Sequence, residues 1–333
     1  MSKGIRFTRT AALAVAGVLA VTACGTASGT AQISLVAFSV TKAATDDLQA
    51  AFARTAAGRG VAIQQSYGAS GDQSRAVASG LKADYVHCSL PSDLDRLVDA
   101  GLVARDWNAG PAKGIAARSV VVLVVRKGNP KQIDDWNDLV KPGVGIVSPN
   151  PGSSGSARWN ILAAYGAAAQ HGGEQAGTEY LRKFFRNVRA LPGSARDATT
   201  AFTGGTGDVL ISYESEAIFA RQKGEDFDYV VPDTTLLIET PAAITTTASP
   251  QATAWREFVF SKAGQTEFAR FGWRPAVPGV HVGVRGANDP ANAYPEPRRL
   301  LTIDGDFGGW SATAKKFFDA NDGLVTRIQQ QAG

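Results

Sequence analysis

A glycine- and serine-rich turn that leads into an alanine-rich run constrains the fold of this chain most strongly. The turn is Asn150-Pro-Gly-Ser-Ser-Gly-Ser-Ala-Arg-Trp159, and the run is Asn160–Ala169. The prolines on either side of Asn150 end any earlier element, and the glycines allow a tight turn. Apolar side chains then recur at helical spacing, which predicts a helix that begins near Ser154 or Gly155. Its unpaired N–H groups would attract an anion to the positive end of the helix dipole, unless Ser154 is an ordinary N-cap.

Two further turns have the same composition and the same position in the pattern. Ser66–Arg75 and Leu191–Thr200 each contain glycine and serine, and each leads into a predicted helix. All three turns follow predicted strands, namely Val61–Gln64, Val144–Val147 and Val188–Leu191. In α/β proteins, the carboxyl ends of strands are where ligands bind. The sequence therefore predicts that three helix N-termini converge on one anionic ligand.

Strands and helices alternate along most of the chain, which predicts α/β architecture with mostly parallel sheets. The other predicted strands are Ile33–Phe38, Ala83–Leu90, Ser119–Val125, Asp208–Tyr213 and Asp228–Val231, with an extended run at Leu236–Ile244. The predicted helices include Ala43–Ala57 and Asp93–Ala100. The run at Ser119–Val125 is nearly all β-branched, so this strand is expected to be buried on both faces.

The order of these elements predicts two lobes. If Ser119–Arg126 carries the chain out of one lobe and Leu236–Ile244 brings it back, the segment between them is an inserted lobe. We expect residues 32–120 and 243–333 to form the first lobe, with the C-terminal segment packing across both, and residues 121–242 to form the second. Two chain crossings make a hinge beside a cleft, and an anion held between the three turns would close it.

The first 23 residues are typical of an export signal. Lys3, Arg6 and Arg9 precede the apolar segment Ala11–Ala23, which is too short to span a bilayer because a span needs roughly 20 residues. The stretch around Cys24 resembles a bacterial lipobox, which implies a diacylglycerol on Cys24. Residues 24–31 would then be a lipid-anchored tether, and the protein would be exported to the outer face of the cytoplasmic membrane. The alternative is an ordinary signal peptidase site with an incidental cysteine.

Charge and cysteine content exclude some functions and stabilising features. The chain has 34 basic and 30 acidic side chains, and three of the basic ones lie in the export signal. The mature protein is thus close to neutral, which argues against a nucleic-acid-binding surface. With Cys24 lipidated, Cys88 is left alone, so no internal disulfide is expected and the core must stabilise the fold.

Four long stretches resemble the bacterial sulfate-binding proteins of ABC importers. They are Arg126–Gly143, Pro149–Gly166, Gly207–Ile211 and Leu301–Trp310, and the similarity extends from about Ile33 to about Ile328. The resemblance implies a two-lobed periplasmic-binding-protein fold of type II, with two mostly parallel sheets and a hinge of two chain crossings. It also implies a monomeric receptor without cofactor or metal, which delivers sulfate to a membrane permease driven by a separate ATPase.

The same resemblance implies a ligand set of neutral donors around a dehydrated sulfate. Carried over to this chain, these are the hydroxyl and N–H of Ser70, the Ser154 hydroxyl, the N–H groups of Gly155 and Ser156, the N–H of Ala195, and Tyr213. Tyr213 stands where the family has a tryptophan indole, and Ser156 stands where a glycine is usual. The tyrosine is the more serious departure, because ring size and donor position both change.

A site made only of donors would select sulfate over phosphate. Sulfate carries no proton at neutral pH, whereas phosphate keeps one, and leaving that proton unpaired in a dry site costs about 1–3 kcal/mol. Asp72 follows the first turn and would supply the missing acceptor, unless it faces solvent and only meets the helix dipole. Arg75, Arg158 and Arg196 each follow a turn closely, and we expect them to form outer ion pairs or attract anions from a distance.

The chain is not expected to be an enzyme. His87 and Cys88 are neighbours in a strand, so their side chains point to opposite faces and cannot share a proton. His171 and His281 have no metal-like spacing, Glu214 and Glu216 are typical of a charged surface turn, and the turn at residues 152–158 lacks the lysine of a phosphate-binding loop. A phosphate- or molybdate-binding protein of the same fold and an exported phosphatase or sulfatase remain the alternatives, and acceptance of thiosulfate stays open.

Overall fold

The computed structural model describes residues 31–332. The predicted export signal, the predicted lipidation site Cys24 and nearly all of the predicted tether lie outside the described residues. Among residues 31–332, no helix is both long enough and apolar enough to cross a membrane.

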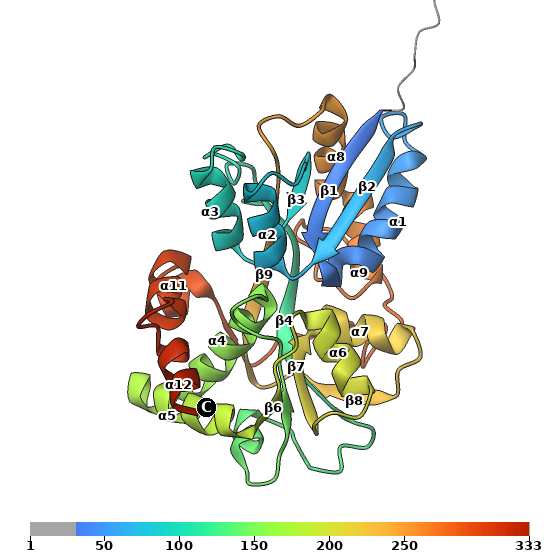
Figure 1. The fold of residues 1–333 in the computed structure, drawn as a ribbon. Helices are drawn as coiled ribbons and strands as arrows, with labels where there is room; N and C mark the ends of the chain where they lie inside the picture. Colours follow the sequence, from blue (N-terminus) through green and yellow to red (C-terminus); the bar gives the residue numbers. More distant parts are fainter. Residues whose placement is uncertain (1–30, 333) are drawn as a thin grey trace, which may run out of the picture. The chain divides into compact units, whose positions relative to one another are not determined.

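The strands form one path of hydrogen-bonded neighbours in the order β2-β1-β3-β9-β4-β7-β5-β6, with β10 beside β9 and β8 beside β4. Their bounds are β1 (Gln32–Phe38), β2 (Ala62–Gly68), β3 (Tyr85–His87), β4 (Ile115–Arg126), β5 (Ile146–Val147), β6 (Val188–Ala190), β7 (Val209–Tyr213), β8 (Phe227–Val230), β9 (Thr234–Ile244) and β10 (Arg299–Leu301). In Figure 1, β4 extends from the strands β1–β3 toward β6, β7 and β8.

Strand directions are more mixed than the sequence predicts. β1 runs parallel to β2 and β3, β5 runs parallel to β6 and β7, and β10 runs parallel to β9. The long strands β4 and β9 pair antiparallel with each other; β9 is also antiparallel to β3, and β4 to β7 and β8. In the strand order, β4 and β9 lie next to each other between the two groups of parallel strands, and β9 meets the first group at β3 while β4 meets the second at β7.

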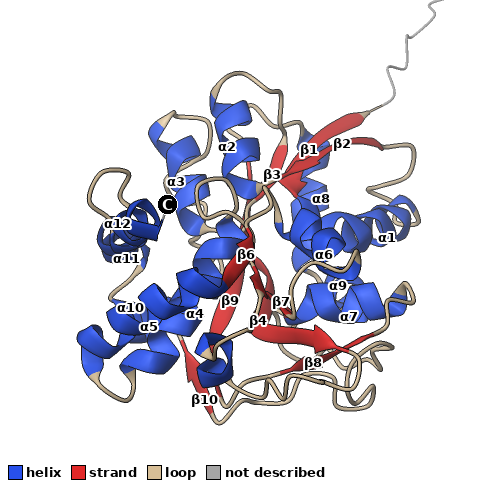
Figure 2. Cartoon of the chain, turned by 60° about the horizontal axis from the view of Figure 1, so that its bottom comes forward, coloured by secondary structure: helices blue, strands red, loops and turns tan. Residues whose placement is uncertain are grey.

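Helices cover both sides of these strands (Figure 2). Their bounds are α1 (Lys42–Ala53), α2 (Ser70–Ala78), α3 (Pro91–Asp99), α4 (Gly155–Ala169), α5 (Gly173–Asn187), α6 (Ala195–Thr203), α7 (Glu214–Gln222), α8 (Pro250–Phe260), α9 (Lys262–Arg270), α10 (Ile303–Phe307), α11 (Trp310–Phe318) and α12 (Leu324–Ala332), with short 3-10 turns η1 (Ser39–Thr41) and η2 (Trp136–Val140). At the C-terminus, α11 contacts α3 and α12 contacts α5.

The centre of the core is β4, whose β-branched run is buried on both faces as predicted. Val121, Leu123 and Val125 belong to the large apolar cluster on one face, while Val120 and Val124 belong to a second cluster on the other. This division follows from the alternation of side chains along a strand. The strand therefore contributes to the packing on both faces of the sheet, under the helices on either side.

The alanine-rich helix α4 is buried around almost its whole circumference, which explains its lack of a polar face. It packs against α5 and β9. Small residues permit this close packing: a Cβ added at Gly166 would lie 2.6 Å from the Leu301 Cδ1 atom. The sequence of α4 is thus suited to placing its N-terminus deep in the protein, where charges and dipoles are poorly screened.

The three predicted helix starts are confirmed. α2 begins at Ser70 after β2, α4 begins at Gly155 after β5, and α6 begins at Ala195 after β6. The predicted strand Ala83–Leu90 is wrong at both ends, because β3 spans only Tyr85–His87. The three residues after β3, 88–90, turn the chain toward α3, and Pro91 begins that helix, where a proline is well tolerated.

Candidate functional site

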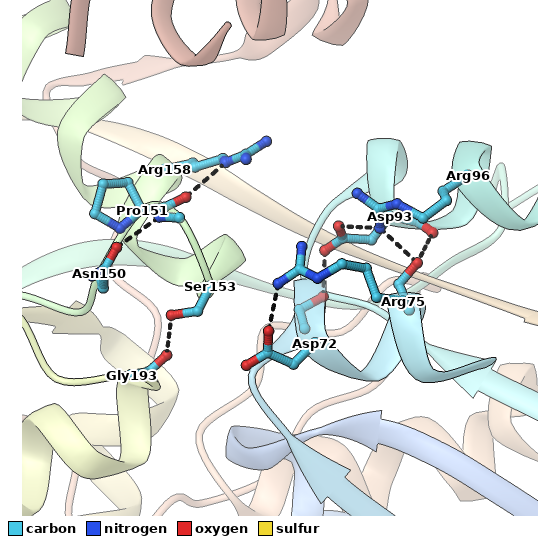
Figure 3. Close-up of polar contacts among 12 residues, drawn as sticks. Asp72, Arg75, Asp93, Arg96, Asn150, Pro151, Ser153, Arg158 and Gly193 are labelled. Carbon is cyan, nitrogen blue, oxygen red and sulfur yellow. Dashed lines mark hydrogen bonds and ion pairs between the residues drawn. The ribbon is translucent and has the colours of Figure 1, made fainter. Parts of the chain in front are cut away.

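The three glycine- and serine-rich turns lie against one another (Figure 3). The Gly71 N–H in α2 donates to the Ser153 carbonyl oxygen at 3.2 Å, which joins the first turn of α2 to the turn before α4. The Ser153 hydroxyl donates to the Gly193 carbonyl oxygen at 2.7 Å, and the Asn150 N–H donates to the Pro192 carbonyl oxygen at 2.8 Å. These bonds join the α4 turn to the α6 turn, so the three helix N-termini meet in one place.

The N-terminus of α4 has buried donors that the helix does not use. Ser154 precedes the helix in an extended conformation (φ −101°, ψ 121°), and among the described residues its side chain makes no capping hydrogen bond. The ordinary N-cap interpretation of Ser154 is therefore wrong. In contrast, Ser194 before α6 does cap its helix, because its hydroxyl accepts the Asp197 N–H at 3.2 Å. Ser154 and Ser156 are both almost completely buried, so their hydroxyls face the protein interior.

Ser70 is also buried, and its hydroxyl already has two partners. The hydroxyl donates to the Asp93 Oδ2 atom at 2.6 Å and accepts the Ser89 N–H at 2.8 Å. Its hydrogen is therefore directed at Asp93 in this structure. The backbone N–H of Ser70 is at the first position of α2, where an N–H has no intrahelical acceptor.

Asp93, rather than Asp72, is the acid next to the site. It is buried in the first turn of α3, and its Oδ1 atom accepts a hydrogen bond from Arg96 at 3.2 Å. Asp72 is 57 % exposed and pairs with Arg75, so the solvent-facing interpretation of Asp72 is confirmed. Both carboxylate oxygens of Asp93 are thus engaged, one by Ser70 and the other by Arg96, which Figure 3 shows beside it. Its position after Pro91, in the first turn of a predicted helix, was the only signal in the sequence.

Tyr213 is fully buried at the carboxyl end of β7. Its ring packs edge-on against Phe38 and Trp273, and its hydroxyl oxygen lies 2.8 Å from the Ser89 Oγ atom. Burial raises the pKa of the phenol, although the nearby hydroxyls of Ser156 and Ser89 partly offset this rise. Tyr213 is therefore neutral at physiological pH, and it is not an aromatic residue at the rim of the site.

Two further segments, which the sequence did not single out, lie beside these turns. Ser89 follows the shortened β3 and contacts both Ser70 and Tyr213. The turn η1, which begins at Ser39 directly after β1, packs against α6. Ser89 and Ser39 both lie at the carboxyl end of a strand, and this is the edge where α/β sheets bind ligands. The predicted end of β1 at Phe38 is correct, so this signal was available for Ser39. It was hidden for Ser89, because the predicted strand ran past this residue to Leu90.

The arginines that follow the turns have partners outside the group of hydroxyls. The Nε–H of Arg158 donates to the Pro151 carbonyl oxygen at 3.2 Å, and its guanidinium lies over the Phe318 ring at 5.0 Å. Arg196 forms an ion pair with Glu216, with 2.8 Å between Nε and Oε1. The predicted outer ion pairing is therefore confirmed for Arg75 and Arg196, while Arg158 stacks on an aromatic ring instead.

The interpretation of Glu214 and Glu216 as a charged surface turn is wrong. Both side chains are fully buried, because α7 begins immediately after β7 and lies against β4. Burial raises the pKa of both carboxyls, and the paired arginines oppose that rise. Glu214 is held by Arg274, with 2.7 Å between Nε and Oε2. Each glutamate thus neutralises its own arginine, and the two carboxylates do not form a catalytic pair.

His87 and Cys88 face opposite sides of the sheet, as predicted. His87 Nε2 lies 3.0 Å from the Thr240 Oγ1 atom, and burial lowers the pKa of the imidazole to about 3. Cys88 packs in a separate apolar cluster, where burial raises the pKa of its thiol. Among residues 31–332, no group of three or more histidine, cysteine, aspartate or glutamate residues is placed to hold a metal ion.

Comparisons with known proteins agree on one family. A family model described as bacterial extracellular solute-binding protein matches residues 33–274. The sulfate-binding protein of Synechococcus elongatus is 40 % identical over 97 % of this chain and 96 % of that protein, and the thiosulfate-binding protein of Escherichia coli is 34 % identical over 82 % of each. The solved structure of the sulfate-binding protein SubI from Mycobacterium tuberculosis H37Rv is 44 % identical, with a TM-score of 0.81, covering 87 % of this chain and all of that one.

Proposed function

This chain belongs to the bacterial extracellular solute-binding proteins, and on that premise we propose that it is a sulfate receptor of an ABC importer. Its fold is the periplasmic-binding-protein fold of type II. Two relatives named above bind sulfate and one binds thiosulfate, according to their names. The receptor would hold a dehydrated sulfate where the three helix N-termini meet and would release it to a membrane permease with its own ATPase.

The observation that carries this proposal is the buried, uncapped N-terminus of α4. Its N–H groups at Gly155 and Ser156 are at the positive end of a long helix, and Ser154 adds a hydroxyl that does not cap the helix. All of these groups are neutral, so binding a divalent anion there needs no buried positive side chain. Fixed donors in a water-poor site stabilise a bound charge more strongly than they do in water.

We assign the remaining contacts to Ser70, Ala195 and Tyr213. From Ser70 the donor would be the backbone N–H, because its hydroxyl hydrogen is directed at Asp93. Ala195 begins α6 and would supply its N–H, and the neutral phenol of Tyr213 would replace an indole as the last donor. Ser156 would contribute its N–H, and its side chain is buried beside the start of α4.

The surroundings of the site support sulfate over phosphate. A bound phosphate would need an acceptor for its proton, and an unpaired one costs about 1–3 kcal/mol. Asp72 is exposed and paired with Arg75, and both oxygens of Asp93 already accept hydrogen bonds. A phosphate-binding function is thus less well supported. Molybdate is larger than sulfate, so it would have to fit among the same donors despite its size. We propose no catalytic activity.

We further propose that residues 32–120 and 243–333 form one lobe and residues 121–242 the other. The long strands β4 and β9 support this division, because β9 pairs with β3 of the first group, β4 pairs with β7 of the second, and the two strands pair with each other. Sulfate would then bind between lobes, with Ser70 on one side and Ser154 on the other. Bending of β4 and β9 would open and close the cleft.

The export and anchoring of the receptor are also part of the proposal. The matched family is extracellular by description, and the lipobox-like sequence before Cys24 supports a lipid anchor. A diacylglycerol would hold a monomeric receptor at the outer face of the cytoplasmic membrane, close to the permease. Two acyl chains are needed for firm anchoring, because one chain alone binds only marginally.

Calorimetric titration of the mature protein tests the ligand assignment. Sulfate should bind with high affinity, phosphate should fail to compete at equal concentration, and thiosulfate and molybdate should be measured beside them. Phosphate that binds as tightly as sulfate would contradict the donor-only site. A measurable rate of hydrolysis on chromogenic phosphate or sulfate esters would contradict the assignment as a receptor.

A further inference from the structure

We infer that Ser89 is a positioning residue, which fixes the Tyr213 hydroxyl toward the anion and holds the end of β3 against α4. This inference rests on the proposed sulfate site. It concerns a residue outside the assigned contacts, and it explains how a tyrosine serves as a donor at that position.

Every polar group of Ser89 is used, and each one reaches a different element. Its N–H donates to the Ser70 hydroxyl in α2 at 2.8 Å. Its carbonyl oxygen accepts the indole N–H of Trp159 in α4 at 2.8 Å. Its hydroxyl lies 2.8 Å from the hydroxyl of Tyr213 in β7. With a side chain that is 0 % exposed, Ser89 is the residue at which these three elements are tied together.

Ser89 also lies directly against the first residue of α4. A Cβ added at Gly155 would be 2.8 Å from both the Cβ and the Oγ atoms of Ser89. The N–H of Gly155 is one of the proposed sulfate donors, so Ser89 packs against the backbone that presents it. The serine is small enough to allow this contact, and its three hydrogen bonds keep it from moving away.

The hydroxyl pair has one hydrogen left for an anion. Ser89 and Tyr213 each have one hydroxyl hydrogen, and one of the two is used in the bond between them. When the Ser89 hydroxyl donates to the Tyr213 oxygen, the Tyr213 hydrogen is free and its direction is set. Without the Ser89 hydroxyl, a buried phenol loses its partner and rotates without a fixed direction, which weakens the bond it makes to sulfate.

The test is a double-mutant cycle on the mature protein with sulfate as the ligand. Ser89→Ala, Tyr213→Phe and the double variant would be compared by calorimetry and by stopped-flow tryptophan fluorescence. We expect Ser89→Ala to speed sulfate dissociation about tenfold with an association rate close to wild type, since one buried hydrogen bond is lost. The double variant should be within about twofold of Tyr213→Phe, because the serine acts through the tyrosine.

Two further variants separate positioning from general damage. Ser249→Ala is the matched control, because among the described residues the Ser249 hydroxyl is buried without a hydrogen-bond partner, and its sulfate kinetics should be those of wild type. Ser89→Cys keeps the size of the side chain with a weaker hydrogen-bonding group, so its dissociation rate should lie between those of wild type and Ser89→Ala. If Ser89→Ala does not fold, the dissociation rate of Ser89→Cys still tests the inference.

The outcomes distinguish this inference from the proposed function. If wild-type protein does not bind sulfate, the proposed function fails and the inference fails with it. If wild type binds sulfate but Ser89→Ala dissociates at the wild-type rate, only the inference is overturned. Effects of Ser89→Ala and Tyr213→Phe that simply multiply in the double variant would also overturn it, because two independent contacts would then be lost.

Discussion

Replacing Gly155 by alanine should abolish tight sulfate binding while leaving a folded protein. The added Cβ would lie 2.8 Å from three atoms: Leu90 Cγ, Ser89 Cβ and Ser89 Oγ. Both neighbours are completely or almost completely buried, so neither can yield easily, and the N-terminus of α4 must move outward. Overpacking of this kind costs about 1–3 kcal/mol, and the higher helix propensity of alanine returns at most about 1 kcal/mol.

The loss of affinity follows from what that movement displaces. The N–H groups of Gly155 and Ser156 would both leave their proposed positions, and each hydrogen bond to a charged group contributes about 1.5–3 kcal/mol. Loss of one such bond weakens binding roughly ten- to a hundredfold, and loss of both weakens it further. Calorimetric titration with sulfate measures the affinity, and thermal unfolding without sulfate checks that the variant is folded.

A matched control is available in the neighbouring turn. A Cβ added at Gly193 would meet no atom closer than the Asp197 Oδ2 atom at 4.0 Å, so Gly193→Ala should bind sulfate like wild type. If Gly155→Ala also binds sulfate with wild-type affinity, the proposed position of the anion at the start of α4 is wrong. If both variants lose binding equally, the steric argument fails, because the damage would not depend on the contact with Ser89 and Leu90.

Three further predictions follow from the chain and its charges. Cys24→Ala should move the protein from the membrane fraction to the soluble exported fraction or block its processing, which fractionation and mass determination measure; unchanged retention and maturation would contradict the lipid anchor. Sulfate affinity should be nearly constant between about pH 5 and 8, because neither sulfate nor the backbone donors titrate there and burial raises the pKa of Tyr213 further from this range; a steep change in titrations across that range would show that a charged group contributes. Arg274→Ala should lower the free energy of unfolding in urea by about 3–5 kcal/mol, because it leaves Glu214 as an uncompensated buried charge. Arg298→Ala, at a largely exposed ion pair, should change that free energy little, and an equal loss in the two variants would contradict the burial argument.

Several features of this fold could be predicted because they depend on short-range patterns. The starts of α2, α4 and α6 follow from glycine and serine before an apolar helical repeat, and the structure places them at Ser70, Gly155 and Ala195. The burial of β4 follows from its β-branched run. The resemblance in long stretches of sequence supplied the family, and the comparisons confirm it.

Other features were missed because the same local pattern permits two environments. Glu214 and Glu216 have the sequence of an exposed turn, yet α7 lies against β4 and buries both. Their arginine partners are Arg274 and Arg196, and the first of these is 60 residues away. Nothing within the turn itself indicates that a distant arginine will neutralise the charge.

The sequence by itself determined which backbone segments could bind an anion, because free N–H groups at a helix start depend only on neighbouring residues. Only the tertiary structure decided how the side chains around that anion are used. Ser89 and Tyr213 are 124 residues apart, and Ser70 and Asp93 are 23 apart, yet hydrogen bonds join these four residues in one series that passes through the backbone N–H of Ser89. Hydrophobic periodicity predicts which residues are buried. It does not predict the hydrogen-bond partner of a buried polar group, because that partner is whichever group the packing of distant strands and helices brings within about 3 Å.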